Sequence, residues 1–282
     1  MGVTWLSSYP RSGNTWMRFL LSSYVFGQAD TWRDGVGGLV QELQFWLKKT
    51  REEGVPTEDI LRQIEELAPL PHGGQGCPRH RMIKTHYVLN ERLPLLGHTR
   101  AFIYVLRHPK DVLLSGLNWT RLTTDYSGSD RDYAEEFIRV GGDPVWKKVG
   151  FGTWEEHARS WLGSKEFPHI LVRYEDLHTQ PECELRRIVE FLALPVSEER
   201  LAQAVKHSTL ERLRRLELTA RQEGKFFPAN EGYYFMHKGH HGQRLASIAP
   251  ELDDAFDERF ATALAEFGYA LPHEVGAHME QV

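Results

Sequence analysis

The segment that most constrains the fold is residues 3–21, where a short apolar run leads into a polar turn and then an amphipathic stretch. The turn has the sequence SSYPRSGNT and carries one permanent cation, Arg11. Consecutive backbone N–H groups in such a turn, together with the positive end of the following helix dipole, bind an anion. The segment therefore predicts a strand, a phosphate-binding loop and a helix within an α/β domain.

This turn differs from the loop that binds nucleoside triphosphates. That loop carries Gly-Lys-Ser/Thr where the helix begins, with the Lys on the outer phosphates and the hydroxyl on Mg²⁺. Here Gly13-Asn14-Thr15 occupies the place, and the cation has moved ahead of the helix to Arg11. No acidic strand end that would hold a metal is evident, which disfavours an ATPase or a kinase. We therefore expect an anionic ligand that needs no Mg²⁺, and no metal site.

A second strand-and-helix motif covers residues 101–115. The apolar run AFIYVL predicts a buried parallel strand that ends at Arg107, and Pro109 begins the helix that follows. The planar fork of Arg107 suits a phosphate, and Ser115, about two turns along, offers a hydroxyl to the same anion. The alternative is a surface ion pair between Arg107 and Asp111. Together with the first motif, the pattern favours an anion site.

Between these motifs, residues 81–87 read RMIKTHY and predict a short strand that ends near His86. Imidazole has an ordinary pKa near ~6.5, so His86 is suited to accept a proton from a hydroxyl around neutral pH. A further apolar run, residues 169–174, ends at Tyr174. Because the carboxyl ends of parallel strands meet at one edge of a sheet, we expect these side chains to share one site with the phosphate loop.

In this order the motifs resemble those of sulfotransferases that use 3′-phosphoadenosine 5′-phosphosulfate (PAPS), over nearly the whole chain. Residues 9–16 are similar to the loop that holds the 5′-phosphosulfate, although that loop more often has Lys where this chain has Arg11. Arg107 and Ser115 are similar to the 3′-phosphate site of the family. The chain looks most similar to bacterial enzymes that sulfate hydroxyls on natural products such as glycopeptide antibiotics.

The resemblance implies a set of donor-binding residues, which are Arg11, Ser12, Gly13, Asn14, Thr15, Trp16, Arg107, Ser115, Tyr174, Ser208, His237, Lys238 and Gly239. It also implies three catalytic residues, which are His86, Lys84 and Arg11. Trp16 and Tyr174 are expected to contact adenine, and ordinary packing is the alternative for both. Ser208 is expected to supply a polar adenine contact. The alternative is that Ser208 and Glu211, three residues apart, belong to a helix capping box at Ser208 or nearby.

Residues 235–242 resemble the Arg-Lys-Gly-x-x-Gly loop that closes over the 3′-phosphate, and they match it at Lys238 and Gly239. His237 stands where the family usually has Arg, so a titratable group replaces a permanent cation. Arg244 is the alternative source of that charge. A metal site built on the nearby histidines is disfavoured, because no Cys or carboxylate joins them at ligand spacing.

Apolar runs and amphipathic stretches alternate along the chain. Strands are expected near residues 3–8, 81–85, 101–107 and 169–174, and helices near 15–25, 38–49, 57–67, 110–119, 153–163, 181–193, 197–206, 208–219 and 250–267. This alternation predicts a single α/β domain of the P-loop-like class over residues 1–282, with a central parallel sheet and helices on both faces. The irregular stretches 68–80, 120–152 and 220–237 are expected to be lids over the acceptor site, or satellite clusters.

The amino-acid composition limits the classes of binding partner that we expect. The 282 residues carry a net charge of −5, which gives no electrostatic reason to expect nucleic acid. No stretch has the apolar length of a membrane span or the pattern of a secretory leader. Cys77 and Cys183 are too few for a disulfide framework. We therefore expect a cytoplasmic protein without a membrane partner, and the sequence leaves its oligomeric state open.

The expected function is transfer of a sulfuryl group from PAPS to a hydroxyl of a small-molecule acceptor, which leaves adenosine 3′,5′-bisphosphate (PAP). The acceptor is expected to be a natural product, as in antibiotic biosynthesis, and its scaffold is not indicated. Two alternatives stay open. A regulatory protein would bind the same nucleotide without turnover, and the intact sequence Lys84-Thr85-His86 argues against it. A P-loop kinase would instead need Mg²⁺ and ATP.

Overall fold

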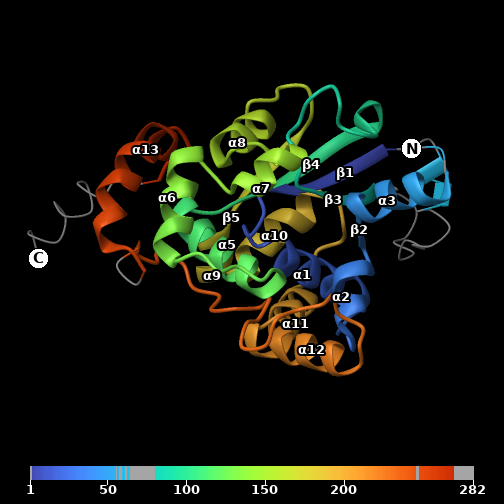
Figure 1. Cartoon of the computed structure of the whole chain (residues 1–282). Coiled ribbons are helices and arrows are strands. Elements are labelled where there is room, and N and C mark those ends of the chain that lie inside the picture. Colours follow the sequence, from blue (N-terminus) through green and yellow to red (C-terminus); the bar gives the residue numbers. More distant parts are fainter. Residues whose placement is uncertain are drawn as a thin grey trace, which may run out of the picture.

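The computed structural model describes residues 2–54, 56, 59, 60, 62, 63, 80–245 and 248–269 (Figure 1). Within these residues, a five-stranded parallel sheet has the order β2-β3-β1-β4-β5. The strands are β1 (Gly2–Ser8), β2 (Val40–Glu42), β3 (His80–Thr85), β4 (Thr99–Leu106) and β5 (His169–Arg173). All strands run the same way, so their carboxyl ends form one edge, as the alternating sequence predicts.

Helices cover both faces of the sheet. They are α1 (Asn14–Phe26), α2 (Trp32–Gly37), α3 (Leu43–Glu53), α5 (Pro109–Thr123), α6 (Asp130–Val140), α7 (Pro144–Trp146), α8 (Trp154–Leu162), α9 (Tyr174–Thr179), α10 (Pro181–Phe191), α11 (Glu198–His207), α12 (Leu210–Gln222) and α13 (Asp253–Glu266). Shorter turns of helix are η1 (Leu96–His98), η2 (Lys147–Phe151) and η4 (Pro250–Leu252). In Figure 1, α8 lies above the strands, whereas α1 and α11 lie below them.

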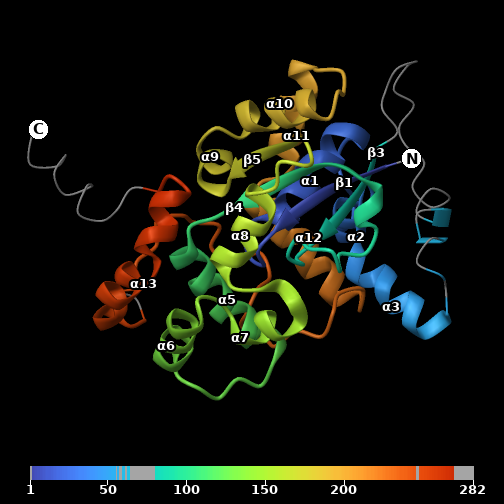
Figure 2. The same ribbon diagram turned by 90° about the horizontal axis from the view of Figure 1, so that it is seen from above.

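Two apolar clusters hold these layers together, one on each face. Consecutive residues of β1 divide between them: Trp5 packs into the cluster beneath α8, and Leu6 packs into the cluster with α1, α10 and α11. This division follows from the two-residue period of a strand. Beside the sheet, α6 and α13 lie next to each other (Figure 2), with Phe137 and Phe260 in ring contact. The sheet is therefore buried on both faces, as parallel sheets usually are.

Two local predictions are wrong. The helix expected near residues 38–49 begins only at Leu43, because Val40–Glu42 form β2 and pair with β3. The stretch 120–152, expected to be irregular, contains α6, α7 and the π-helical turn η2. A capping box between Ser129 and Asp132 starts α6, and its apolar side packs into the core. Tertiary packing determines the secondary structure of both segments, and the hydrophobic periodicity of the sequence does not reveal that packing.

Other expectations have mixed outcomes. The expected strands are present, with small shifts at their ends. The same holds for the helices expected near residues 15–25, 110–119, 153–163, 181–193, 197–206, 208–219 and 250–267. The short helices α2 and α9 were not expected. The helix near 57–67 and the stretch 68–80 lie almost wholly outside the described residues. The stretch 220–237 is irregular only after α12 ends at Gln222.

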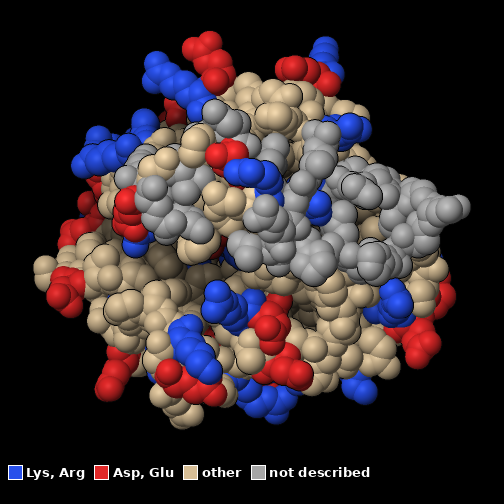
Figure 3. Space-filling view, turned by 90° about the vertical axis from the view of Figure 1, so that its right-hand side faces the viewer, with Lys and Arg blue, Asp and Glu red and all other residues tan. Residues whose placement is uncertain are grey.

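Charge on the described part of one face of the molecule is mixed in sign. Figure 3 shows Lys and Arg interspersed with Asp and Glu over the face that lies at the right-hand side of Figure 1. A nucleic-acid backbone requires a continuous basic patch or stripe. The described part of this face has the mixed pattern of an ordinary protein surface.

Packing of α2 against α1 predicts opposite effects for two glycines in one helix. A Cβ at Gly35 would collide with the buried ring of Phe19, whereas one at Gly37 would meet nothing within 4 Å. We expect Gly35→Ala to lower the free energy of unfolding by about 1–3 kcal/mol, because the core has no room to relax. Gly37→Ala should be neutral or stabilising by up to ~1 kcal/mol, from helix propensity. Urea unfolding measures both, and equal changes would contradict the packing of α2.

Candidate functional site

A cavity of about 1010 Å³ lies at the carboxyl ends of the strands. Among the residues that line it are Arg11, Lys84, His86, Arg107 and Tyr174, which come from the ends of four strands. Pockets for one small ligand usually measure about 300–1,000 Å³. The volume of this cavity is at the upper end of that range, which suits a large ligand such as a nucleotide.

The phosphate loop lies between β1 and α1 and adopts strained backbone at two positions. Gly13 has φ 101°, and an added Cβ there would lie 2.6 Å from the ring of Tyr174, so only glycine fits. Arg11 has φ 67°. The side-chain amide of Asn14 donates to the carbonyl oxygen of Leu6 at 3.2 Å and to Ser8 Oγ at 3.3 Å, which ties the turn to the end of β1. The loop is thus held in place for binding.

Arg11 extends from this loop into the cavity. Its Nε donates to Ser115 Oγ at 3.0 Å, and a terminal nitrogen donates to the carbonyl oxygen of Phe235 at 2.9 Å. Burial, and then the charge of Arg107, lower the pKa of Arg11 to about 10, so the guanidinium is still charged at neutral pH. The predicted residues Arg11, Arg107 and Ser115 are therefore neighbours.

Arg107 follows β4, and its guanidinium lies 4.1 Å from the ring centre of Tyr174. It donates to the carbonyl oxygens of Arg11 at 2.9 Å and His240 at 2.7 Å, while its buried Nε has no partner. The alternative pairing with Asp111 is not formed, because that buried carboxylate accepts the amides of Gly242 and Gln243 instead. Arg107 thus joins the phosphate loop to the loop after Phe235.

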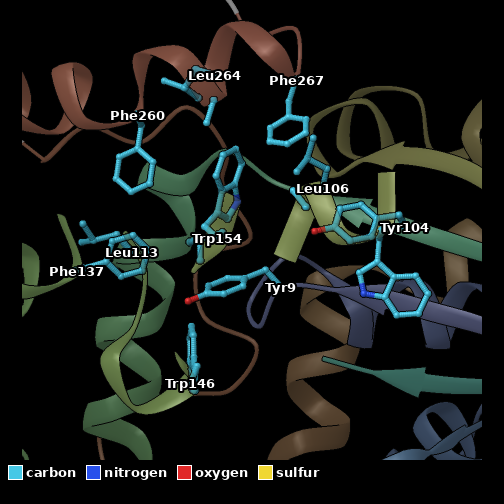
Figure 4. Close-up of a cluster of buried hydrophobic side chains, with 14 of the residues drawn as sticks. Tyr9, Tyr104, Leu106, Leu113, Phe137, Trp146, Trp154, Phe260, Leu264 and Phe267 are labelled. Carbon is cyan, nitrogen blue, oxygen red and sulfur yellow. The ribbon is translucent and has the colours of Figure 1, made fainter. Parts of the chain in front are cut away.

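The end of β4 is fixed from the other face of the sheet. Trp154 lies among Phe260, Leu264 and Phe267 in the apolar cluster of Figure 4. Its indole nitrogen donates to the carbonyl oxygen of Arg107 at 3.1 Å. The backbone that presents Arg107 is therefore held by the core itself.

The phosphate loop is fixed in a similar way. Tyr9 packs against Trp146 with ring centres 5.6 Å apart, and its hydroxyl accepts the amide of Asp143 at 2.9 Å. Both partners belong to the stretch 120–152, which sequence reasoning placed in a lid. Part of that stretch is therefore a structural support for the site.

His86 lies just beyond β3, and one hydrogen bond fixes its ring. Its Nδ1 lies 2.6 Å from the carbonyl oxygen of Ser8, which requires Nδ1 to be the donor and leaves Nε2 as the acceptor in the neutral ring. Burial, and then the charge of Lys84, hold the pKa of His86 well below its ordinary value. The ring is therefore neutral at neutral pH, which is the form a general base needs.

Lys84 lies near His86, and its ammonium donates to Glu42 Oε1 at 2.6 Å. Burial lowers the pKa of Lys84, and the Glu42 carboxylate opposes that shift. Sequence reasoning missed Glu42, because three residues of an edge strand give no periodic signal.

At the other end of the cavity, Trp16 and Tyr174 meet edge to face, with ring centres 5.7 Å apart. The Trp16 indole donates to the carbonyl oxygen of Ser208 at 3.0 Å, and the buried Ser208 hydroxyl has no partner. The helix cap that the sequence allowed at Ser208 or nearby is formed by the adjacent Thr209, which caps α12. His178, which sequence reasoning did not select, lies beside Trp16 with ring centres 6.1 Å apart.

The loop after Phe235 brings His237, Lys238 and Gly239 to the cavity, as predicted. The Arg214 side chain from α12 donates to the carbonyl oxygens of Met236 and His237. Burial, and then Lys238, lower the pKa of half-buried His237 to about 4. The imidazole is therefore uncharged at neutral pH before an anion binds. Arg244 is not among the described residues that line the cavity.

Within the described ranges, no three His, Cys, Asp or Glu side chains are grouped so as to hold a metal ion. Over the same ranges, no helix combines the length and apolar character that a bilayer span requires.

Comparison with known proteins places the chain in a family. The family described as "Sulfotransferase domain" matches residues 3–268, so the chain belongs to it, which confirms the predicted resemblance. Curated relatives include "Sulfotransferase 1A1" of Rattus norvegicus, 28% identical over 74% of this chain, and "Sulfotransferase 1 family member D1" of Mus musculus, 27% identical over 72%. The chain spans just under two thirds of the length of these relatives, 66% and 63% respectively.

Solved structures share the fold. Mouse sulfotransferase SULT7A1, complexed with PAP, matches with a TM-score of 0.64 at 19% identity, over 93% of this chain and 84% of that one. Retinol dehydratase, in complex with androsterone and inactive cofactor PAP, matches with a TM-score of 0.63 at 19% identity, over 96% and 83%. These likenesses confirm the predicted class, a single α/β domain with a P-loop-like parallel sheet.

The contacts of Asp111 predict how firmly the last loop is held. Asp111→Asn leaves one acceptor oxygen for two amides, so hydrogen exchange at Gly242 and Gln243 should become about tenfold faster or more, from the loss of one buried hydrogen bond. Exchange measured by mass spectrometry tests this. Asp132→Asn, which alters an exposed carboxylate that accepts the amide of Ser129 at a helix cap, is the control. Unchanged exchange in Asp111→Asn would show that this carboxylate does not hold the loop.

Proposed function

We propose that this protein is a PAPS-dependent sulfotransferase. The observation that carries the proposal is that the guanidinium groups of half-buried Arg11 and buried Arg107 share one cavity with a neutral proton acceptor, His86. Guanidinium groups suit a ligand with two phosphates, and His86 suits an acceptor hydroxyl. Membership of the sulfotransferase-domain family supports the same activity.

The residues present fit such a donor. Three buried polar groups at or beside the cavity have no partner: Ser12 Oγ, Ser208 Oγ and Arg107 Nε. Buried polar groups are usually hydrogen-bonded, so these three are suited to a polar ligand. The residues that would hold the 5′-phosphosulfate are Arg11, Ser12, Gly13, Asn14 and Thr15. Those for the 3′-phosphate are Arg107, Ser115, His237, Lys238 and Gly239, and those for adenine are Trp16, Tyr174 and Ser208.

The donor supplies a sulfuryl group bonded to a phosphate, and that phosphate is the leaving group. His86 Nε2 would accept the proton of the acceptor hydroxyl, while the Nδ1–H bond to the Ser8 carbonyl oxygen fixes the tautomer and the orientation of the ring. Arg11 and the N–H groups of the phosphate loop would stabilise the negative charge that grows on the phosphate, and Lys84 would do so near the bridging oxygen. These groups are positioned before reaction, which lowers the cost of reaching the transition state.

The acceptor half of the cavity is apolar and aromatic. Its lining includes Trp32, Trp119, Trp146, Phe151, Phe227, Tyr233 and Phe235. Such walls suit a ring-containing molecule larger than a simple alcohol. Among the structural neighbours, retinol dehydratase is in complex with androsterone or retinol, two apolar molecules. We infer that the acceptor is a hydroxylated natural product, that parts of 120–152 and 220–237 cover it, and that transfer occurs in the cytoplasm.

The assay that tests the function combines PAPS with a panel of hydroxylated phenols and polycyclic natural products, and detects products by mass spectrometry. Wild type should add one sulfuryl group to at least one class, and His86→Ala should lower kcat by about 10²-fold or more, from the loss of the general base. His98→Ala, at an exposed position, is the control. PAP binding without transfer by wild type would favour the regulatory alternative, and near-normal turnover in His86→Ala would remove that residue from the mechanism.

Arg107 gives a test that needs no turnover. If it binds the 3′-phosphate, Arg107→Ala should weaken PAP binding by ~2 kcal/mol or more, the scale of a lost charge-assisted hydrogen bond in a buried site. Adenosine 5′-phosphosulfate lacks that phosphate and should lose far less affinity. Calorimetric titration measures both ligands, with exposed Arg139→Ala as the control. Equal losses for the two ligands would place Arg107 outside the 3′-phosphate site.

A further inference from the structure

Three charged side chains form a cluster beside His86, and only one of them was selected from the sequence. Glu42 is paired in register with Lys84 across strands β2 and β3, so the two side chains lie on the same face of the sheet. Their charged atoms are 2.6 Å apart. The third member, Arg18 of α1, has Nη1 3.9 Å from the other oxygen of Glu42. One carboxylate thus contacts two cations.

The cluster is part of the cavity wall. All three residues line the cavity, but the Glu42 side chain is 40% exposed, whereas those of Lys84 and Arg18 are 9% and 7% exposed. The two cations are therefore largely removed from water, and the carboxylate is the most exposed of the three groups. A buried cation without a partner costs far more free energy than one held by a carboxylate.

Arg18 also fixes the strand that carries Glu42. Its guanidinium donates to the carbonyl oxygens of Val36 and Val40, at the end of α2 and the start of β2. The helix that follows the phosphate loop therefore holds β2 in place, and β2 presents Glu42 to Lys84. Each link is a directional contact, so the position of the Lys84 ammonium depends on all of them.

We propose that Glu42 is a positioning residue that fixes both the place and the charge of Lys84 beside His86. The catalytic consequence of this role rests on the proposed function. The positioning role itself is argued from the geometry of the cluster. Neither Glu42 nor Arg18 belongs to the motifs that carry the resemblance to sulfotransferases.

The direction of the effect follows from the surrounding charges. The titratable and charged groups that act on Lys84 or on its neighbour His86 are Arg18 from α1, Glu42 from β2 and His157 from α8. Burial and Arg18 lower the pKa of Lys84, and Glu42 raises it. Loss of the carboxylate removes the only opposing charge among these groups. The protonated form of Lys84 then becomes less stable.

The experiment compares Glu42→Gln, which keeps the shape without the charge, with Glu42→Asp, which keeps the charge. An opposite charge at this distance shifts a pKa by about 1–3 units. The alkaline limb of the kcat profile should therefore move down by about one pH unit or more in Glu42→Gln, and kcat should fall about tenfold at one unit above the new pKa. Glu42→Asp should restore much of the loss.

Two controls separate this role from general damage. Glu155→Gln alters a carboxylate that binds Arg259 at 2.7 Å away from the cavity, and it should leave the pH profile unchanged. In a Lys84→Met background, Glu42→Gln should cause no further loss of kcat, because the residue it acts through is gone. Additive losses in the double variant would overturn the proposal.

A measurement without turnover distinguishes this proposal from the proposed function. With ¹³C-labelled lysine, NMR titration of the donor-free protein reports the pKa of Lys84, assigned by its loss in Lys84→Met. That pKa should fall in Glu42→Gln even if wild type transfers no sulfuryl group. Should Glu42→Gln fail to fold, Glu42→Asp should show an intermediate shift. An unchanged Lys84 pKa in the folded variant would overturn the proposal.

Discussion

The close placement of two guanidinium groups, buried Arg107 and half-buried Arg11, is the constraint on which the site depends. The charge of Arg107 helps to lower the pKa of Arg11, so the pair is repulsive until an anion lies between or beside them. The two guanidinium groups are held in place by the hydrogen bonds that they donate to the backbone carbonyl oxygens of Arg11, Phe235 and His240. Like charges kept together in one cavity favour a ligand with several negative charges. The surrounding loops are arranged around this pair.

The parts proposed to bind the donor and to accept the proton are joined through one short piece of backbone. Ser8 ends β1, where its side chain accepts the Asn14 amide and its carbonyl oxygen accepts Nδ1–H of His86. The same strand end thus shapes the phosphate loop and sets the tautomer of the proposed base. Arg18 of α1, the helix that follows the loop, donates to the carbonyl oxygen of Val40 in β2. Glu42 of β2 pairs with Lys84, so α1 is connected to Lys84 as well. Binding and chemistry therefore share their supports.

Much of this arrangement could be predicted from the sequence. The runs that became β1, β3, β4 and β5 are apolar and long enough to identify, and parallel pairing then brings Arg11, His86, Arg107 and Tyr174 to one edge. Glu42 could not be found, since β2 is three residues long and is defined by its pairing with β3. The stretch 120–152 was wrongly expected to be irregular. Its helix α6 starts at a capping box, and its role depends on distant contacts such as Asp143 with Tyr9.

The central claim is that this cavity binds a 3′,5′-bisphosphorylated adenosine without a metal. Its most direct test is calorimetric titration of PAP, and separately of ATP with Mg²⁺, into the full-length protein, with EDTA present in the PAP experiment. Our account predicts one PAP per protein with unchanged affinity in EDTA, and ATP with Mg²⁺ binding at least ~100-fold more weakly, the effect of about 2.8 kcal/mol from the missing 3′-phosphate contacts. Tight binding of ATP with Mg²⁺ and no binding of PAP would contradict it.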